Sequence, residues 1–225
     1  DAILAAVLAQ DPQGHVACET MAGYNRVIIS GEVTAKAKVD FVSVTREQIK
    51  RLGYTDPELH FSDESPIEVY VHEQSPEIAV GVDHQGAGDQ GMMFGFACTQ
   101  TPQFMPLPIV LAHALTKRMD QIREQKALSY LRPDGKSQVT VEYKNGEAVR
   151  VQQVVIAVPH KESIKIDQVK KDIYKVVVTP VLERYGFKIN KKDLIVNGTG
   201  IWHHGGPASD CGVTGRKIVV DTYGG

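Results

Sequence analysis

Cysteine, excess positive charge and long apolar runs are all scarce in this sequence, and each scarcity argues against a class of protein. Only Cys18, Cys98 and Cys211 occur among the 225 residues, which favours reduced thiols over a disulfide framework. The formal net charge of −2 argues against a nucleic-acid-binding protein, because such proteins usually carry a basic surplus. No apolar stretch approaches the roughly 20 residues that a membrane-spanning helix needs. We therefore expect a cytoplasmic protein whose partners are neither nucleic acids nor membranes.

Two common nucleotide-binding signatures are also absent. No Gly-x-Gly-x-x-Gly lies between a strand pattern and a helix pattern, and no Gly-Lys-Ser/Thr P-loop occurs. These absences argue against a Rossmann sheet and against an unrelated kinase-like phosphotransferase. The composition, 42% hydrophobic and 23% charged, is ordinary for a globular protein of one or two domains that buries a substantial core.

Hydrophobic periodicity and turn signals predict an α+β fold with helices layered on mixed or antiparallel sheets. Asn145-Gly146 is a strong hairpin signal, and Pro180 should distort a long helix that Gly186 closes. Thr45 begins a capping-box pattern for a short helix. The expected helices cover about 1–11, 45–53, 106–126 and 166–185. The expected strands cover about 16–19, 26–34, 67–71, 92–97, 139–143, 149–151, 154–158, 194–196 and 217–220.

A glycine-rich string is the most distinctive feature that the sequence does contain. Residues 86–91 read Gly-Ala-Gly-Asp-Gln-Gly and lead into the apolar run Met-Met-Phe-Gly-Phe-Ala at 92–97. Glycine lets a backbone adopt positive φ and approach a ligand closely, and Asp89 adds a hydrogen-bond acceptor. We interpret the apolar run as a buried strand that holds the loop at its end. A tight turn without a ligand would explain the glycines equally well.

A second string places an acid and a cation at the start of a strand. Asp134 and Lys136 flank Gly135 within Arg-Pro-Asp-Gly-Lys-Ser-Gln-Val-Thr at 132–140. Both side chains can point at a bound nucleotide from that position. A hairpin cap without a ligand is the alternative, because Asp favours turns by itself.

A third string, at 205–217, reads Gly-Gly-Pro-Ala-Ser-Asp-Cys-Gly-Val-Thr-Gly-Arg-Lys and forms a loop with one carboxylate and two adjacent cations. Arg216 supplies a planar fork for phosphate oxygens, and Lys217 supplies a mobile point charge. The carboxylate is that of Asp210. A surface turn with a solvated Arg-Lys pair is the alternative.

A fourth group of polar residues lies on or beside predicted strands. It consists of Cys-Glu-Thr at 18–20, Gly-Glu-Val-Thr at 31–34 and Glu-Gln-Ser-Pro at 73–76. Strand carboxylates are usually solvated, but Glu32 lies among apolar residues directly after a glycine. Glu32 is therefore the strongest candidate of this group for a functional role.

In order and spacing, these four groups resemble the S-adenosylmethionine synthetases (methionine adenosyltransferases), over essentially the whole chain. The resemblance implies three similar α/β sandwich-like domains, two of them nearly complete here. Residues 1–76 would be an amino-terminal domain truncated at its start. Residues 85–203 would be the middle domain, and 204–225 the start of a carboxy-terminal domain.

The resemblance also implies an activity. Members of the family join ATP and L-methionine, by attack of the sulfur on ribose C5′, and hydrolyse the displaced triphosphate to phosphate and pyrophosphate. A thioether is a weak nucleophile, so the rate must come from in-line positioning and from stabilising the departing charge. Mg²⁺ and K⁺ are the implied cofactors. Homodimers, or dimers of dimers forming a homotetramer, with shared active sites are the implied assembly.

Site residues follow from matching the family motifs position by position. The residues matched to catalysis are Asp89, Lys136, Arg216 and Lys217. The residues matched to methionine are Glu32, Gln74 and Asp210. The residues matched to ATP are Asp134, Gly135, Lys136, Ile201, Trp202, Asp210, Arg216 and Lys217. Glu19 matches the potassium-site glutamate, and the Mg²⁺ ligand is expected before Asp1.

The chain also departs from the family pattern. The Gly-His-Pro-Asp-Lys string and the later glycine-rich lysine string are absent, so we expect part of a longer protein that is inactive by itself. The linker at 82–85 is shorter than the family's gate. Where many members have Gly-Arg-Phe, residues 200–204 read Gly-Ile-Trp-His-His. Trp202 can replace the aromatic on adenine, and His203 with His204 could alternatively form a metal pair. A non-catalytic or regulatory member that binds only nucleotide or a partner subunit is the alternative function.

Overall fold

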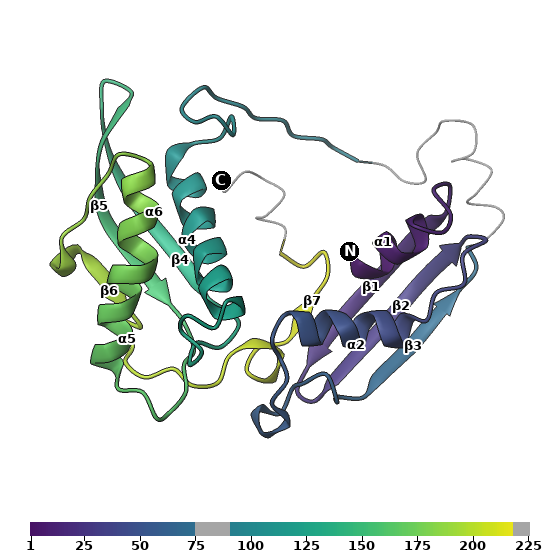
Figure 1. The fold of residues 1–225 in the computed structure, drawn as a ribbon. Helices are drawn as coiled ribbons and strands as arrows, with labels where there is room; N and C mark the ends of the chain where they lie inside the picture. Colours follow the sequence, from purple (N-terminus) through teal and green to yellow (C-terminus); the bar gives the residue numbers. More distant parts are fainter. Residues whose placement is uncertain (75–90, 218–225) are drawn as a thin grey trace. The chain divides into compact units, whose positions relative to one another are not determined.

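The computed structural model describes residues 1–74 and 91–217. The loop around Asp89 and most of the strand expected at 217–220 therefore lie outside the described residues. The chain forms two compact units, unit 1 with residues 1–95 and 206–225 and unit 2 with residues 96–205. Each unit contains one sheet and its own helices, which confirms the expected α+β class (Figure 1). Within the described ranges, no helix is long and apolar enough to cross a membrane.

Unit 1 is built on a mixed sheet with the strand order β3-β2-β1-β7. β1 runs antiparallel to β2, β2 runs parallel to β3, and the short β7 adds to the free edge of β1. The buried cluster of this unit consists of Ile3, Val27, Ile29, Ile49 and Phe61. The elements are α1 (Ala2–Leu8), β1 (His15–Gly23), β2 (Arg26–Thr34), α2 (Phe41–Arg51), the 3₁₀ turn η1 (Pro57–Leu59), β3 (Ile67–His72), the 3₁₀ turn η4 (Gly206–Ala208) and β7 (Gly212–Val213).

Gly31 sets the local geometry of the β1–β2 pair. Its φ is +140°, and a Cβ at this position would lie 2.0 Å from the carbonyl oxygen of Ala17 on β1. Backbone atoms cannot withdraw from such an overlap without breaking the pairing, so only glycine fits. This requirement explains the glycine that precedes Glu32.

Helix α2 begins earlier than the sequence predicted. The capping-box start at Thr45 is wrong, because Asp40 caps the helix and its carboxylate accepts a hydrogen bond from the Ser43 amide at 3.1 Å. Aspartate is among the preferred N-cap residues. The earlier start also brings Phe41 and Val44 against the buried cluster of unit 1.

Unit 2 contains a three-stranded sheet with the order β4-β5-β6, antiparallel and then parallel. Asn145 and Gly146 form the β4–β5 hairpin with φ values of 51° and 82°, which confirms the hairpin prediction. The strands expected at 149–151 and 154–158 form a single strand, β5. The elements are α4 (Leu107–Glu124), β4 (Lys136–Lys144), β5 (Glu147–Ala157), α5 (Ile166–Asp172), the π-helical segment η2 (Ile173–Val178), α6 (Thr179–Arg184), the 3₁₀ turn η3 (Lys191–Asp193) and β6 (Leu194–Val196).

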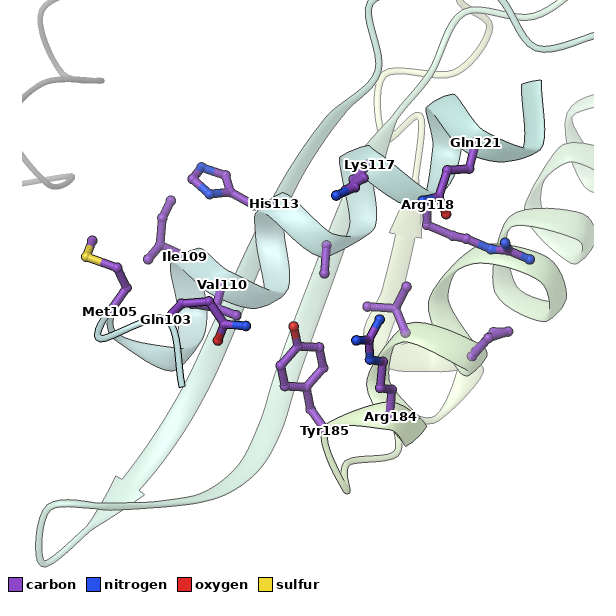
Figure 2. A pocket seen from close by; sticks show the side chains of 13 residues that line it. Gln103, Met105, Ile109, Val110, His113, Lys117, Arg118, Gln121, Arg184 and Tyr185 are labelled. Carbon is purple, nitrogen blue, oxygen red and sulfur yellow. The ribbon is translucent and has the colours of Figure 1, made fainter. Parts of the chain in front are cut away.

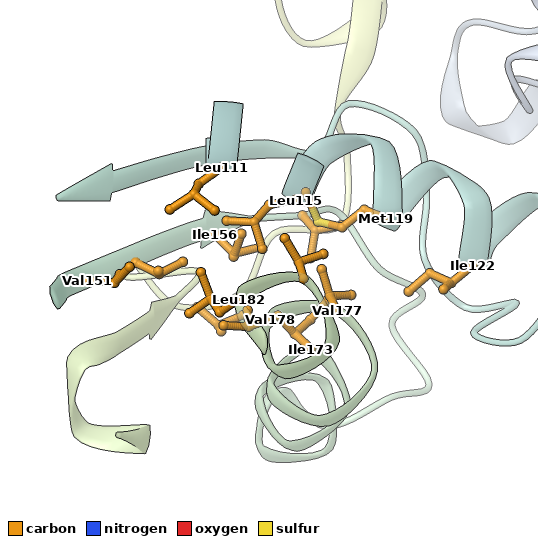
Figure 3. Packing of buried hydrophobic residues seen from close by; sticks show 14 of the residues in the cluster. Leu111, Leu115, Met119, Ile122, Val151, Ile156, Ile173, Val177, Val178 and Leu182 are labelled. Carbon is orange, nitrogen blue, oxygen red and sulfur yellow. The ribbon is translucent and has the colours of Figure 1, made fainter. Parts of the chain in front are cut away.

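The core of unit 2 lies where α4 and the α5–α6 helical run face the sheet. Leu111, Leu115 and Met119 from α4 pack with Ile156 from β5 and Leu182 from α6 (Figure 3). All except Met119 have no exposed surface. These side chains recur at helical spacing along α4, as the sequence predicted.

The helical run from α5 to α6 is distorted ahead of Pro180, one turn before the place predicted. Proline has no amide hydrogen to donate, so a preceding carbonyl loses its helical partner. The side chain of Arg118 on α4 replaces such a donor, because its Nε bonds the Val176 carbonyl at 3.1 Å. Thr179 Oγ1 similarly bonds the Tyr174 carbonyl at 2.8 Å. These two side-chain hydrogen bonds thus stabilise the π-helical segment η2.

The prediction of a buried strand at 92–97 is wrong. The described residues of this run form no strand, and Met93 and Phe94 are 87% and 67% exposed. An apolar run buries its side chains only where another element covers them, and no described strand pairs with this one. Periodicity alone cannot supply that information.

Candidate functional site

The turn before β4 and the loop after β6 come together in unit 2. The ammonium of Lys136 lies 4.9 Å from the ring centroid of Trp202, a cation–π distance. A Cβ built on Gly205 would lie 3.2 Å from both Asp134 Oδ2 and Trp202 Cζ2, which places these groups side by side. We name Asp134, Lys136, Trp202 and Gly205 the Lys136 cluster. The structure therefore brings together three residues that the sequence proposed for ATP.

The turn that carries Asp134 is fixed against α4. Asp134 has a φ of 80°, a conformation that Asp tolerates better than most residues. A Cβ on Gly135 would approach Met119 Cε to 2.9 Å, so the absent side chain lets the turn lie close to the helix. Ser137 Oγ donates to the Ala112 carbonyl at 2.7 Å and ties the start of β4 to the middle of α4. The backbone that carries Lys136 is thus held rigidly against α4.

A buried amide supports the loop that carries Trp202. Asn197, which follows β6, is 5% exposed and has a φ of 46°. Its Oδ1 accepts from the Val158 amide at 2.8 Å, and its Nδ2 donates to the Val158 carbonyl at 3.0 Å. This two-bond clasp joins the chain after β6 to the chain after β5.

Further bonds hold residues 202 and 203 in place. The His160 amide donates to the Trp202 carbonyl at 3.1 Å, and Arg132 Nη1 donates to the His203 carbonyl at 2.6 Å. His203 Nδ1 lies 2.9 Å from the His160 carbonyl oxygen. Neither sequence pattern nor family motif singled out Arg132, His160 or Asn197. An Asn directly after a strand and an Arg within the 132–140 string were the available signals.

His160 contacts this loop from inside the fold. Its side chain is fully buried, with its ring centroid 4.9 Å from that of His203. Burial lowers the pKa of His160 below its usual value, because a charged imidazolium would lose its hydration. Its Nε2 is buried and has no hydrogen-bond partner among the described residues.

The candidate residues on β2 and β3 meet at one end of the unit 1 sheet. Glu32 Oε1 lies 3.5 Å from Nε2 of His72, its register partner on β3. The backbone amide of Gln74 donates a hydrogen bond to Thr34 Oγ1 at 3.1 Å. Two of the three residues proposed for methionine therefore lie at neighbouring parallel strands, Glu32 within β2 and Gln74 just after β3.

Glu19 and the 206–217 segment meet at the other edge of that sheet. The Thr214 hydroxyl donates to the Glu19 carboxylate and accepts from the Thr20 amide at 2.8 Å. Arg216 donates to the Cys211 carbonyl, and the side chains of Asp210 and Lys217 are exposed. The oxygens of Glu19 and Thr214 suit a hard cation such as K⁺ but supply only part of a coordination shell. The described residues contain no group of three or more His, Cys, Asp or Glu side chains that could hold a metal.

Comparison with known proteins assigns all three parts of the chain to one family. The S-adenosylmethionine synthetase N-terminal domain matches residues 1–76, the central domain 84–202 and the C-terminal domain 204–225. The chain belongs to the S-adenosylmethionine synthetase family. This assignment confirms the resemblance that the motifs indicated.

Curated relatives carry the name S-adenosylmethionine synthase. The protein of Brachyspira hyodysenteriae is 44% identical over 239 residues, and that of Parafrankia sp. is 45% identical over 243 residues. Both alignments cover 100% of this chain and 60% or 61% of the relative. The protein of Desulfosudis oleivorans is 44% identical and covered to 60%. The chain thus spans about three fifths of the length of the synthases that it matches.

Residues 200–204, where the chain departs from the family pattern, lie in the loop after β6. Ile201, at the position of the family's arginine, is 66% exposed. Trp202 contacts Lys136, and its Nε1 donates to the His204 carbonyl. His203 points toward His160, whereas His204 lies 3.8 Å from Glu162. The two adjacent histidines therefore have different partners.

Proposed function

We propose that the protein containing this chain is a methionine adenosyltransferase, which converts ATP, L-methionine and water into S-adenosylmethionine, phosphate and pyrophosphate. The observation that carries the proposal is the Lys136 cluster, in which an ammonium at the start of β4 contacts an aromatic face on the loop after β6. An adenine ring needs a flat apolar surface, and a triphosphate needs fixed cations. Family membership and the names of the relatives add independent support.

In this proposal each side chain has a role that its chemistry allows. Trp202 stacks on adenine, and Lys136 stabilises the charge that develops on the departing triphosphate. Arg216 and Lys217 contact the polyphosphate, while Asp134 and Asp210 position the nucleoside. The rigid backbone at Lys136 favours this role, because a preorganised cation needs no rearrangement as charge develops on the leaving group.

Glu32 and Gln74 hold the amino and polar groups of methionine, and Asp89 assists them from the glycine-rich loop. The sulfur then attacks ribose C5′ in line with the leaving oxygen. Mg²⁺, when bound, neutralises charge on the triphosphate, and we propose Glu19 as a K⁺ ligand. Three similar domains, a cytoplasmic location and a homodimer or dimer of dimers with shared sites complete the proposal.

A non-catalytic member of the family is the second candidate. The exposed Ile201 favours it, because the family arginine at this position is missing from the nucleotide contact. The two candidates differ in turnover. We expect the full-length protein, given ATP, methionine, Mg²⁺ and K⁺, to release phosphate and pyrophosphate in equal amounts with S-adenosylmethionine.

Substitutions test the assignment of roles. In the full-length protein, Lys136→Ala should lower kcat by roughly 10²–10³-fold, the usual effect of removing one charge-stabilising donor. Asp89→Asn should also lower turnover by orders of magnitude. Lys144→Ala is the matched control, because Lys144 is an exposed lysine at the far end of the same strand. If the wild type turns over and Lys136→Ala has the same kcat, the proposed role of Lys136 is refuted. A folded wild type without turnover would favour the second candidate.

A further inference from the structure

A pocket between α4 and α6 lies outside the Lys136 cluster. Its volume is about 650 Å³, which falls in the range typical of small-molecule sites. Figure 2 shows Arg184 and Tyr185 from the end of α6 pointing toward α4, which contributes His113, Lys117 and Arg118. None of its lining residues belongs to the 132–136 turn or the 200–205 loop.

Positive charge gathers among the residues that line this pocket. Lys117, Arg118 and Arg184 all line it, and its lining includes no Asp or Glu from the described part of the chain. The described residues also provide no salt bridge to any of these three cations. Cations on neighbouring helices repel one another, so an uncompensated group of them favours an anion.

Arg118 is held in place by the helix distortion. Its Nε donates to the Val176 carbonyl, which lies four residues before Pro180 and cannot accept from a proline amide. The two terminal nitrogens of the guanidinium therefore remain as donors at a fixed position, while Lys117 and Arg184 are exposed and adjustable. Fixed guanidinium donors match phosphate oxygens well.

The remaining surface of the pocket is apolar or aromatic. Val110 and Val181 are buried at its base, and Ile109 and Ala114 are half-buried beside them. Tyr185 adds a half-buried ring with its hydroxyl toward α4 (Figure 2). The volume greatly exceeds that of a phosphate ion, so an inorganic anion alone would leave the apolar base uncovered.

We propose that this pocket is a second ligand site, which binds an anion of nucleotide size that joins phosphate groups to a flat apolar ring. The phosphates would contact Lys117, Arg118 and Arg184, and the ring would lie on the apolar base beside Tyr185. The site is separate from the proposed catalytic site, so it would let such a ligand bind without occupying the Lys136 cluster.

ADP is a suitable probe, with pyrophosphate and adenosine as its two halves. The titrations use the full-length protein with Lys136→Ala, which weakens the proposed ATP site. We expect calorimetry to show that this protein binds ADP, that pyrophosphate binds more weakly than ADP, and that adenosine binds most weakly of the three. Adding Lys117→Gln and Arg184→Gln, both at exposed positions, should weaken ADP binding about 10-fold or more, because two charged contacts are lost.

Lys161→Gln with Lys175→Gln is the matched control, because both lysines are exposed and neither lines this pocket. This pair should leave ADP affinity unchanged. Equal affinities in the pocket variant and its parent would overturn the proposal, as would adenosine binding as tightly as ADP. Turnover of the wild type is measured separately, so failure of the proposed enzyme activity would not be mistaken for failure of this site.

Discussion

The two units hold their candidate residues in different ways. In unit 2, Lys136 and Trp202 rest on buried supports, with Asn197 and His160 inside the fold and Gly135 against α4. In unit 1, Glu19 and Glu32 lie on strands and contact only exposed partners. The comparison teaches that the candidate residues of unit 2 are preorganised by a hydrophobic core, whereas those of unit 1 depend on strand register and on exposed contacts.

The cores differ in the same direction. The larger buried cluster lies in unit 2, where α4 and the α5–α6 run cover the sheet, and unit 1 has a smaller cluster beneath α1 and α2. Support for a functional side chain is more rigid where its neighbours are close-packed. We therefore expect substitutions beneath the candidate residues to lower stability more in unit 2 than in unit 1, except at Gly31, where an added Cβ would overlap backbone atoms.

The largest expected loss of stability is at Gly31 in unit 1, where an added Cβ would overlap backbone atoms. Gly31→Ala in unit 1 should lower the free energy of unfolding by about 3–5 kcal/mol, because its Cβ would overlap the Ala17 carbonyl and its φ of +140° disfavours other residues. Gly146→Ala in the unit 2 hairpin should cost only about 1 kcal/mol, since nothing lies within 4 Å of the added atom. Urea denaturation of each variant gives the two losses. Equal losses would show that Gly31 is not tightly enclosed.

The next comparison uses two asparagines of positive φ. Asn197→Ala in unit 2 should cost about 2–4 kcal/mol, because it leaves the buried amide and carbonyl of Val158 unpaired. Asn25→Ala in unit 1 should cost about 1 kcal/mol, since Asn25 is exposed and its side chain accepts one bond, from Ser65. Thermal unfolding measures both. A smaller loss at Asn197 would contradict the idea of a buried clasp.

The smallest effect concerns pH. The pKa of His160 is lowered in the folded state from an ordinary value of 6.5, so below about pH 6.5 the unfolded chain binds a proton that the folded chain does not. The free energy of unfolding should therefore fall as the pH drops below 6.5, by at most about 1.4 kcal/mol per pH unit for this one group. His160→Gln should flatten that slope below about pH 6.5. An unchanged slope in urea titrations would show that His160 is not buried in its neutral form.

Local patterns predicted much of the fold. The Asn145-Gly146 hairpin, the helix after Pro106 and every strand except the short β7 follow from turn chemistry and periodicity, whereas β7 lies in a segment predicted to be a loop. The start of α2 was missed because Asp40 competes with Thr45 as a cap. The exposed run at 92–97 was missed because burial depends on a neighbouring element, which no local pattern specifies.

The candidate site was predictable only where a motif marks it. The string containing Lys136 carried the family resemblance, whereas Trp202 lies where the chain departs from the family pattern, and the fold brings these two residues into contact. Their supports were not predictable, because Arg132, His160 and Asn197 act through contacts with residues about 40 to 70 positions away in sequence. Single polar residues near strand ends are too common to indicate such contacts.

Tryptophan fluorescence tests the central claim most directly, namely that Lys136 and Trp202 form one preorganised nucleotide site. The full-length protein is titrated with a non-hydrolysable ATP analogue, with Trp202→Phe to identify the signal of that residue. We expect a saturable change in Trp202 emission, and at least about a 10-fold weaker affinity in Lys136→Ala than in Lys144→Ala. A Trp202 signal that does not respond to the analogue, or an affinity that Lys136→Ala leaves unchanged, would contradict the account.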